Sequence, residues 1–286
     1  MALGVVAVSA MREALGKGEN ELIDPEKIVP AGLLTFPSTL SYIDEECGGF
    51  YGLVTVGAER GTGKTMLALA SAISSAAAGW DVFYFASEDD SEGLAVRFNN
   101  FMNANKEMAG GIPNFHLFQT ARGQTPASLT EEIAKVTSGE KPILVVIDSL
   151  NSLVEMSDYS YLDGLTQFGL WMMLARRISK GNASFLCISE TNKSGSIKGE
   201  KLPYWSDQVL VMKRGGGDVV DMELQKSRRT QGVGEMGKWI RIWNQGEFIS
   251  QNELDEMRRS SLRVVAGGAT SLADRVPGKQ AGLFGK

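Results

Sequence analysis

The chain has 286 residues, of which 43% are hydrophobic and 22% charged, and its formal net charge is −5 at pH 7. This composition excludes a disordered or fibrous chain and is typical of a globular protein with a core that needs no disulfide or metal. The two cysteines, Cys47 and Cys187, are far apart, which argues against a zinc site and favours a reducing compartment. Because no apolar run reaches transmembrane length, we expect a cytoplasmic protein with no membrane partner.

The predicted elements alternate between strands and helices up to about residue 205. Residues 1–32 are interpreted as an N-terminal arm or linker. Strands are then expected at residues 51–56, 81–87, 115–118, 142–148 and 183–189, and helices at residues 66–78, 91–109, 125–138 and 163–180. An alternation of this kind predicts an α/β fold with a mainly parallel central sheet.

The pattern changes after residue 205, where short strands are separated by glycine-rich turns. These strands are expected at residues 208–213, 219–226, 237–243 and 247–250. They predict a C-terminal antiparallel extension of the sheet. Residues 251–286 are expected to form a C-terminal helix and a flexible tail, so the predicted core spans residues 33–250.

The segment Gly57-Ala-Glu-Arg-Gly-Thr-Gly-Lys-Thr65 follows the first predicted core strand and matches G-x-x-x-x-G-K-[ST], the phosphate-binding P-loop. Its glycines let successive backbone N–H groups point at phosphate oxygens. Lys64 is predicted to contact the β- and γ-phosphates, and Thr65 to bind Mg²⁺. The following helix presents its N-terminus to the phosphates. We therefore expect ATP and Mg²⁺ as ligands, with the nucleotide-binding residues Gly57, Ala58, Glu59, Arg60, Gly61, Thr62, Gly63, Lys64, Thr65 and Met66.

Two carboxylates follow strands of the predicted parallel sheet. Asp148 ends an apolar, β-branched strand and is expected to hold Mg²⁺ through its water shell. Hydrolysis also needs a base that polarises water, and no glutamate directly follows Asp148. Glu88 is the predicted base. Its alternative role, an N-terminal acid of the next helix, is better filled by Asp89 and Asp90.

A catalytic glutamate on the strand after the P-loop helix resembles the RecA-like P-loop ATPases, and most of all their RadA/Sms, DnaB and KaiC branch. The resemblance covers about residues 33–250 and rests on Phe85–Ser91, Thr191–Gly199, Trp205–Val211 and Leu224–Glu235. It implies that Lys226 and Arg228 reach the ATP of a neighbouring subunit, and therefore a homo-oligomer, either a hexameric ring or a filament. The alternative for these two residues is a solvated basic turn.

The same resemblance places a γ-phosphate sensor at Glu190, with Asn192 as the alternative. Many relatives carry Gln or His there, so Glu190 is a departure.

Two loops, residues 152–162 and 191–201, are expected to face the channel or filament axis. Lysines among glycines and serines suit contacts with single-stranded nucleic acid that do not depend on its sequence, although a solvated connection has the same composition. The predicted DNA-binding residues are Lys193, Lys198 and Lys201.

Together these features predict an oligomeric, Mg²⁺-dependent ATPase that acts on single-stranded DNA. It would be a helicase-like motor or a recombinase in DNA replication, recombination or repair. The chain shows no four-cysteine module like that of RadA/Sms and no duplicated core like that of KaiC, which favours a minimal phage- or plasmid-type ATPase. One alternative is a KaiC-like regulatory ATPase that binds protein partners without nucleic acid, and another is a slow structural ATPase. The tail is a candidate contact for replication or recombination proteins.

Overall fold

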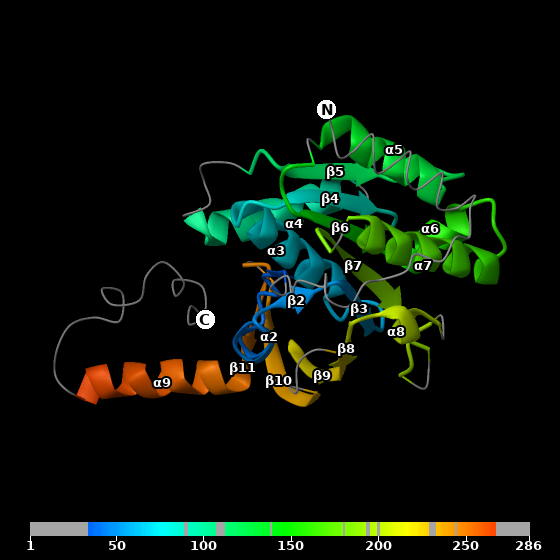
Figure 1. Ribbon diagram of the computed structural model, residues 1–286. Helices are drawn as coiled ribbons and strands as arrows, with labels where there is room; N and C mark the ends of the chain where they lie inside the picture. The colour runs from blue at the N-terminus through cyan, green and yellow to red at the C-terminus, as the bar shows by residue number, and fades with distance from the viewer. Residues whose placement is uncertain are drawn as a thin grey trace, which may run out of the picture.

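The computed structural model describes residues 34–88, 91–106, 112–137, 139–179, 181–192, 195–198, 201–228, 233–243 and 245–266. Within them a nine-stranded sheet has the order β11-β10-β9-β8-β3-β7-β6-β4-β5 (Figure 1). The strands are β1 (Thr35–Phe36), β2 (Phe50–Tyr51), β3 (Leu53–Ala58), β4 (Asp81–Ala86), β5 (Phe115–Gln119), β6 (Ile143–Asp148), β7 (Ala183–Glu190), β8 (Gln208–Arg214), β9 (Val219–Ser227), β10 (Gly234–Ile242) and β11 (Glu247–Ser250). The helices are α2 (Ser41–Cys47), α3 (Lys64–Ala77), α4 (Ser91–Ala104), α5 (Pro126–Val136), α6 (Leu150–Met156), α7 (Tyr161–Ile178), α8 (Lys201–Trp205) and α9 (Gln251–Ala266).

The sheet has a parallel part and an antiparallel part, as the sequence predicts. Strands β8, β3, β7, β6, β4 and β5 are parallel. Strands β9, β10 and β11 continue from β8 in antiparallel pairs. The predicted fold class, an α/β core with a C-terminal antiparallel extension, is confirmed. Strands β1 and β2 form a separate antiparallel pair.

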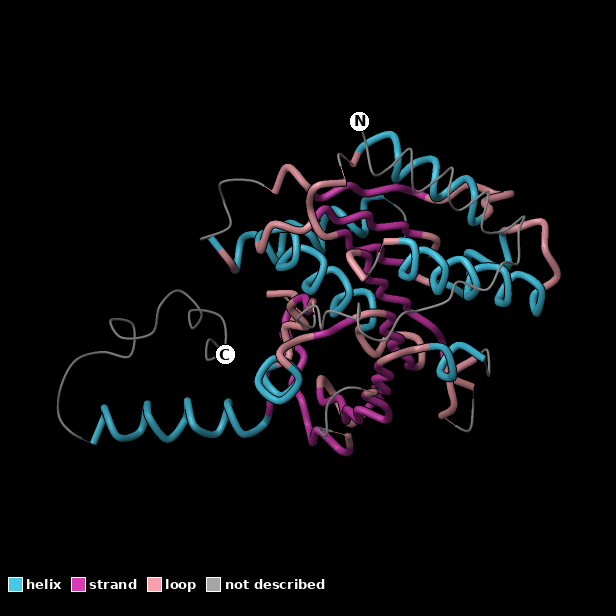
Figure 2. The backbone as a smooth tube through the Cα atoms, viewed as in Figure 1, coloured by secondary structure: helices cyan, strands magenta, loops and turns pink. Residues whose placement is uncertain are grey.

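Helices cover both faces of the parallel strands (Figure 2). Along β3, Val54 and Val56 pack in one core with α3 and α4, whereas Leu53 packs in the other with α5, α6 and α7. This alternation is the period of two that a strand imposes on its side chains. Because both faces are covered, the central strands β3, β4, β6 and β7 are buried along almost their whole length, whereas β5 at the edge of the sheet is partly exposed. No helix among the described residues is both long and apolar enough to cross a membrane.

The predicted loop at residues 152–162 is wrong. Helix α6 occupies its first half, and α7 begins at Tyr161. Leu150, Leu153 and Val154 lie one helical turn apart and are buried, and each such side chain contributes about 1.5–3 kcal/mol when fully buried. Ser149 caps the helix by accepting from the backbone N–H of Ser152. The interspersed polar residues hide this apolar pattern in the sequence.

The predicted N-terminal arm, residues 1–32, lies outside the described residues, as does the tail from residue 267 onwards. The predicted C-terminal helix corresponds to α9. The division of the chain at residues 33 and 250 stays a prediction.

Candidate active site

The P-loop connects β3 to α3 at the carboxyl end of the parallel strands. Gly61 and Gly63 adopt φ values of 75° and 108°, which only glycine takes without strain. Gly63 is also the N-cap of α3 and offers no side-chain cap, and the first turn contains no acidic residue. The N-terminal N–H groups of α3 are therefore available to an anion, with the helix dipole favouring negative charge.

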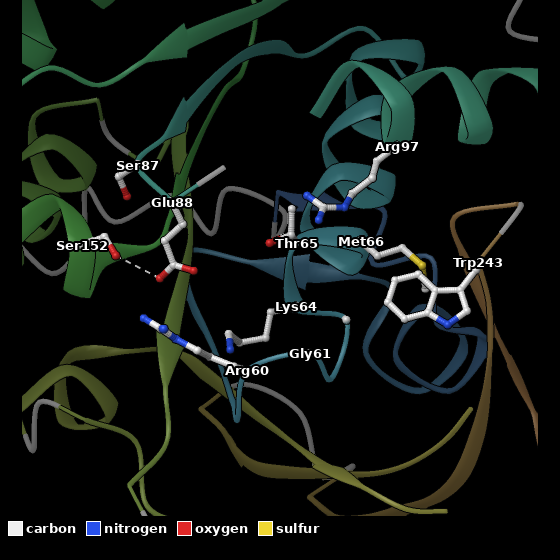
Figure 3. A pocket seen from close by; sticks show the side chains of 11 residues that line it. Arg60, Gly61, Lys64, Thr65, Met66, Ser87, Glu88, Arg97, Ser152 and Trp243 are labelled. Atoms are coloured by element: carbon white, nitrogen blue, oxygen red, sulfur yellow. Dashed lines mark hydrogen bonds between the residues drawn. The ribbon is translucent and has the colours of Figure 1, made fainter. Parts of the chain in front are cut away.

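A cavity of about 490 Å³ opens over this helix end. Its lining residues are Arg60, Gly61, Gly63, Lys64, Thr65, Met66, Ser87, Glu88, Arg97, Ser152 and Trp243. Figure 3 shows Glu88 on one side, Trp243 on the other and Lys64 between them. The volume lies within the range of about 300–1,000 Å³ that is usual for small-molecule sites.

Lys64 is buried, and its ammonium is held by the loop itself. Nζ donates to the carbonyl oxygens of Ala58 at 2.9 Å and Glu59 at 3.0 Å. Burial lowers the pKa of Lys64, while the charge of Glu88 opposes this shift. Because Lys64 also lines the cavity, its ammonium can exchange these carbonyls for phosphate oxygens.

Asp148 ends β6 beside β4, and its carboxylate is almost fully buried. Tyr84 Oη donates to Oδ2 at 2.6 Å, whereas Oδ1 is buried and has no hydrogen-bond partner among the described residues. Burial raises the pKa of Asp148, and the hydrogen bond from Tyr84 opposes the shift. An unsatisfied carboxylate oxygen near the Thr65 hydroxyl fits a Mg²⁺ ion, which prefers oxygen ligands and keeps several waters.

Asp148→Asn is expected to abolish Mg²⁺-dependent hydrolysis and to stabilise the nucleotide-free protein. Because burial raises the folded-state pKa of Asp148 above its unfolded value, the carboxylate costs stability as pH rises through that folded pKa. A neutral Asn removes this cost, and we expect Tm at pH 7 to rise by about 2–4 °C. Thermal unfolding between pH 4 and 8 tests this. The gain over the wild type should grow with pH, and a variant that melts lower at every pH would contradict it.

Glu88 follows β4 and lies next to the start of α6. Its Oε1 accepts hydrogen bonds from the hydroxyls of Ser149 and of Ser152, the latter at 3.0 Å. The two serines fix the carboxylate at the cavity wall before any substrate is bound. The pairing of Ala86 with Asp148 brings Glu88 to the same end of the sheet as the P-loop.

Glu190, at the end of β7, does not line the cavity. It accepts from Arg60 Nε at 2.7 Å and forms an ion pair with Lys198. The hydrogen bonds from Lys198 and Arg60 lower the pKa of Glu190 to about 2, so the cluster loses stability only as pH falls from about 4.5 towards 2. Asn192 Oδ1 accepts from the backbone N–H of Ser196 at 3.0 Å. The sensor role of either residue stays a prediction.

Lys226 and Arg228 lie near the start of the parallel strands, whereas the P-loop of their own chain lies where these strands end. Lys226 pairs with Val209 near the start of β8, which runs parallel to β3, whereas the P-loop follows the end of β3. Lys226 Nζ donates to the carbonyls of Pro203 at 2.8 Å and Tyr204 at 2.9 Å, and Arg228 Nη2 donates to the Tyr204 carbonyl at 2.7 Å. Neither residue lines the cavity over α3.

The predicted DNA-binding lysines fall at three different kinds of position. Lys193 lies outside the described residues. Lys198 forms the ion pair with Glu190, and Lys201 is exposed at the start of α8. Of the two lysines that the structure describes, Lys198 is therefore already engaged by a carboxylate.

Several residues of the site are missing from the sequence prediction. Tyr84 is hidden in a strand that reads as uniformly apolar, and Ser149 and Ser152 read as loop residues. Arg241 and Trp243 come from the antiparallel extension, far from the motif in sequence. The hydroxyl of a tyrosine in a strand expected to be buried is the one signal that could have identified Tyr84, because a buried tyrosine O–H usually has a hydrogen-bond partner.

A sequence profile described as an AAA domain matches residues 21–196, more than half of the chain. The chain belongs to this AAA domain family. No curated protein matches the sequence. In this chain the P-loop, Glu88 and Asp148 lie at the same end of the parallel strands.

Solved structures show the same fold. One, described as an ATPase domain, has 16% identity and a TM-score of 0.60, covering 87% of this chain and 98% of that one. A DnaB-like replicative helicase, described together with its interactions with primase, has 17% identity and a TM-score of 0.61, covering 85% of this chain and 71% of that one. A KaiC-like protein, PH0186 from the hyperthermophilic archaeon Pyrococcus horikoshii OT3, has 16% identity and a TM-score of 0.59, covering 76% and 99%. The fold is that of a RecA-like P-loop ATPase of the DnaB and KaiC branch.

Proposed function

We propose that the protein is an oligomeric, Mg²⁺-dependent ATPase that acts on single-stranded DNA, as a helicase-like motor or a recombinase in DNA replication, recombination or repair. The observation that carries this proposal is the cavity over α3. It gathers Lys64, Thr65 and Glu88 above the buried carboxylate of Asp148. These are the groups that transfer of a phosphoryl group to water requires.

The chemistry follows from how these side chains are held. Lys64 and the N-terminal N–H groups of α3 stabilise negative charge on the β- and γ-phosphates. Glu88, oriented by Ser149 and Ser152, accepts the proton of the attacking water as the bond from water oxygen to γ-phosphorus forms and the bond to the leaving ADP oxygen breaks. Thr65 and Asp148 would hold Mg²⁺, which when bound neutralises phosphate charge.

The position of Lys226 and Arg228 supports an oligomer. Both lie near the start of the parallel strands, whereas the P-loop of their own subunit lies at the end of these strands. Cations in that place can stabilise the transferring phosphoryl group only in a neighbouring subunit. A ring or filament brings the edge of one subunit against the cavity of the next.

Contacts between the P-loop and the segment after β7 support a coupling to a ligand on that segment. Ile197 packs so closely on Gly57 that a Cβ there would lie 2.4 Å from Ile197 Cγ1. Glu190 links Arg60 of the P-loop to Lys198 of the segment. A polyanion that draws Lys198 away from Glu190 therefore changes the contacts of Arg60. Single-stranded DNA is such a polyanion.

The second candidate function is a KaiC-like regulatory ATPase that binds protein partners. The ion pair between Glu190 and Lys198 favours it, because this pair reduces the positive charge that the segment offers to phosphates.

Binding of labelled single-stranded DNA, followed by fluorescence anisotropy over a salt series, tests the proposal. We expect the double variant Lys198→Ala/Lys201→Ala to bind several-fold more weakly. The slope of log K against log salt should decrease by about 0.7 for each lysine removed. Lys135→Ala, an exposed lysine on α5 that pairs with Glu132, is the matched control and should leave the slope unchanged. Wild-type protein that binds no single-stranded DNA at low salt would contradict the proposed action on DNA and favour the regulatory ATPase.

A further inference from the structure

Trp243 is the aromatic residue of the cavity over α3, and the chemistry described above does not use it. It directly follows β10 and lines the cavity across from Glu88 (Figure 3). About half of its surface, 47%, is exposed. Aromatic rings bury large apolar areas when they find a partner, so an open ring inside a binding cavity points to a ligand that covers it.

The ring of Trp243 is held in place. Its Nε1 donates to Asp218 Oδ1 at 2.9 Å. The guanidinium of Arg241 lies over the ring, with Cζ 3.9 Å from the ring centroid, which is a cation–π contact. Arg241 Nη2 in turn donates to the same Asp218 oxygen at 3.3 Å. A ring fixed on one face by a cation and at one edge by a carboxylate loses little freedom when a ligand stacks on it.

Arg241 also ties this ring to the P-loop. Its Nη1 donates to the carbonyl oxygen of Gly61 at 2.5 Å, and its side chain is only 4% exposed. Gly63 of the P-loop also packs against the side chains of Arg241 and Phe248. A Cβ at Gly63 would lie 2.8 Å from Phe248 Cζ and 3.2 Å from Arg241 Cδ. Trp243 is therefore fixed relative to the loop that binds phosphates.

A nucleoside triphosphate carries a flat aromatic base at the far end from its reacting phosphate. The groups that line the cavity follow the same order, with Lys64 and Glu88 at the phosphate side and Trp243 beyond Met66 at the other side (Figure 3). Resting on the proposed ATPase function, we propose that Trp243 is the nucleobase platform of this site. The base stacks on the open part of the indole, and Arg241 is the positioning residue that couples the platform to the P-loop.

The assignment predicts which part of a nucleotide Trp243 recognises. Stacking of a base on an aromatic ring changes affinity roughly 5- to 150-fold and is tolerant of base identity. Trp243→Ala should therefore weaken ATP binding by about tenfold and GTP binding similarly. Inorganic tripolyphosphate has no base, and its affinity should not change. Trp243→Phe keeps a π-face and should retain most of the ATP affinity.

Equilibrium titration of the full-length protein and both variants with ATP and with tripolyphosphate, each with Mg²⁺, tests this. Circular dichroism and the sedimentation profile report folding and assembly in each variant. Equal ATP affinity in wild type and Trp243→Ala would overturn the platform. So would a parallel loss of both ligands, or an altered assembly with ATP affinity intact, because the residue would then serve the loop or a subunit contact. A wild type that binds neither ligand would instead refute the proposed ATPase function.

Discussion

Glu88→Gln is expected to lower kcat for ATP hydrolysis by at least about a hundredfold while leaving ATP affinity within a few-fold of wild type. The amide keeps the size of the side chain but cannot accept the proton of the attacking water. Lys64, Thr65 and the N-terminus of α3 are untouched, so the phosphates are still bound. Steady-state hydrolysis together with equilibrium binding of ATP measures both quantities.

Glu92→Gln is the matched control for this variant. Glu92 is an exposed glutamate in the first turn of α4, a few residues from Glu88 but not lining the cavity. It should leave kcat unchanged. A Glu88→Gln protein that turns over within threefold of wild type would place the base elsewhere. If Glu88→Gln loses turnover but keeps its biological activity, the protein is a structural ATPase in which turnover is dispensable.

The second large effect is a shared active site between subunits. Arg228→Ala should lose at least about a thousandfold in hydrolysis rate, since a cation supplied by a neighbour is typically worth 10³–10⁵ in kcat. Lys64→Ala should lose at least about as much, because it removes the ammonium that contacts the β- and γ-phosphates. Mixed in equal amounts, the two inactive proteins should regain activity. Roughly a quarter of the interfaces then pair an intact P-loop with an intact Arg228, if subunits exchange freely and the interface is head-to-tail.

Mixed-subunit hydrolysis assays measure this recovery, with Lys141→Ala in place of Arg228→Ala as the control. Lys141 lies just before β6, at the same edge of the sheet as Lys226, and contacts Asp81 at 3.8 Å. It should retain wild-type activity. Mixtures that co-assemble but stay inactive would show that Arg228 serves its own subunit or acts only as the hydrogen bond to Tyr204.

The sequence predicts the phosphate end of the cavity well because its signals are local. The P-loop glycines, Lys64 and Thr65 lie within one motif, and Asp148 and Glu88 each follow an apolar strand. Parallel strands place such residues at one edge, whatever the order of the strands. At the motif itself the boundaries differ from the prediction by two residues, because β3 extends to Ala58 and α3 begins at Lys64. At the opposite end of the strand, β3 begins at Leu53 rather than residue 51, because Gly52, at a φ of 66°, separates it from β2.

The base end of the cavity could not be predicted because it depends on sheet order. Arg241 and Gly61 are 180 residues apart in sequence and meet only because β8, β9 and β10 extend the sheet beside β3. The length of the antiparallel extension is visible in the sequence, but its register with respect to the P-loop is not. Trp243 therefore reads as an ordinary strand-end residue until the fold places it.

The ion pairs of Glu190 show a second limit. Lys198 reads as a free lysine on a glycine- and serine-rich loop, and Arg60 as a P-loop residue. Their joint contact with Glu190 follows from the antiparallel bridge between Thr191 and Ile197, which turns the segment back towards β7. A charge pattern along the sequence does not report such pairing.

The proposed function requires that ATP hydrolysis at this P-loop is coupled to single-stranded DNA. Its most direct test is the rate of ATP hydrolysis with and without single-stranded DNA, at protein concentrations that span assembly. We predict at least tenfold stimulation by DNA, appearing only above the assembly concentration and absent in Lys64→Ala. Hydrolysis that depends on Lys64 and on assembly but is the same with and without DNA would contradict the claim.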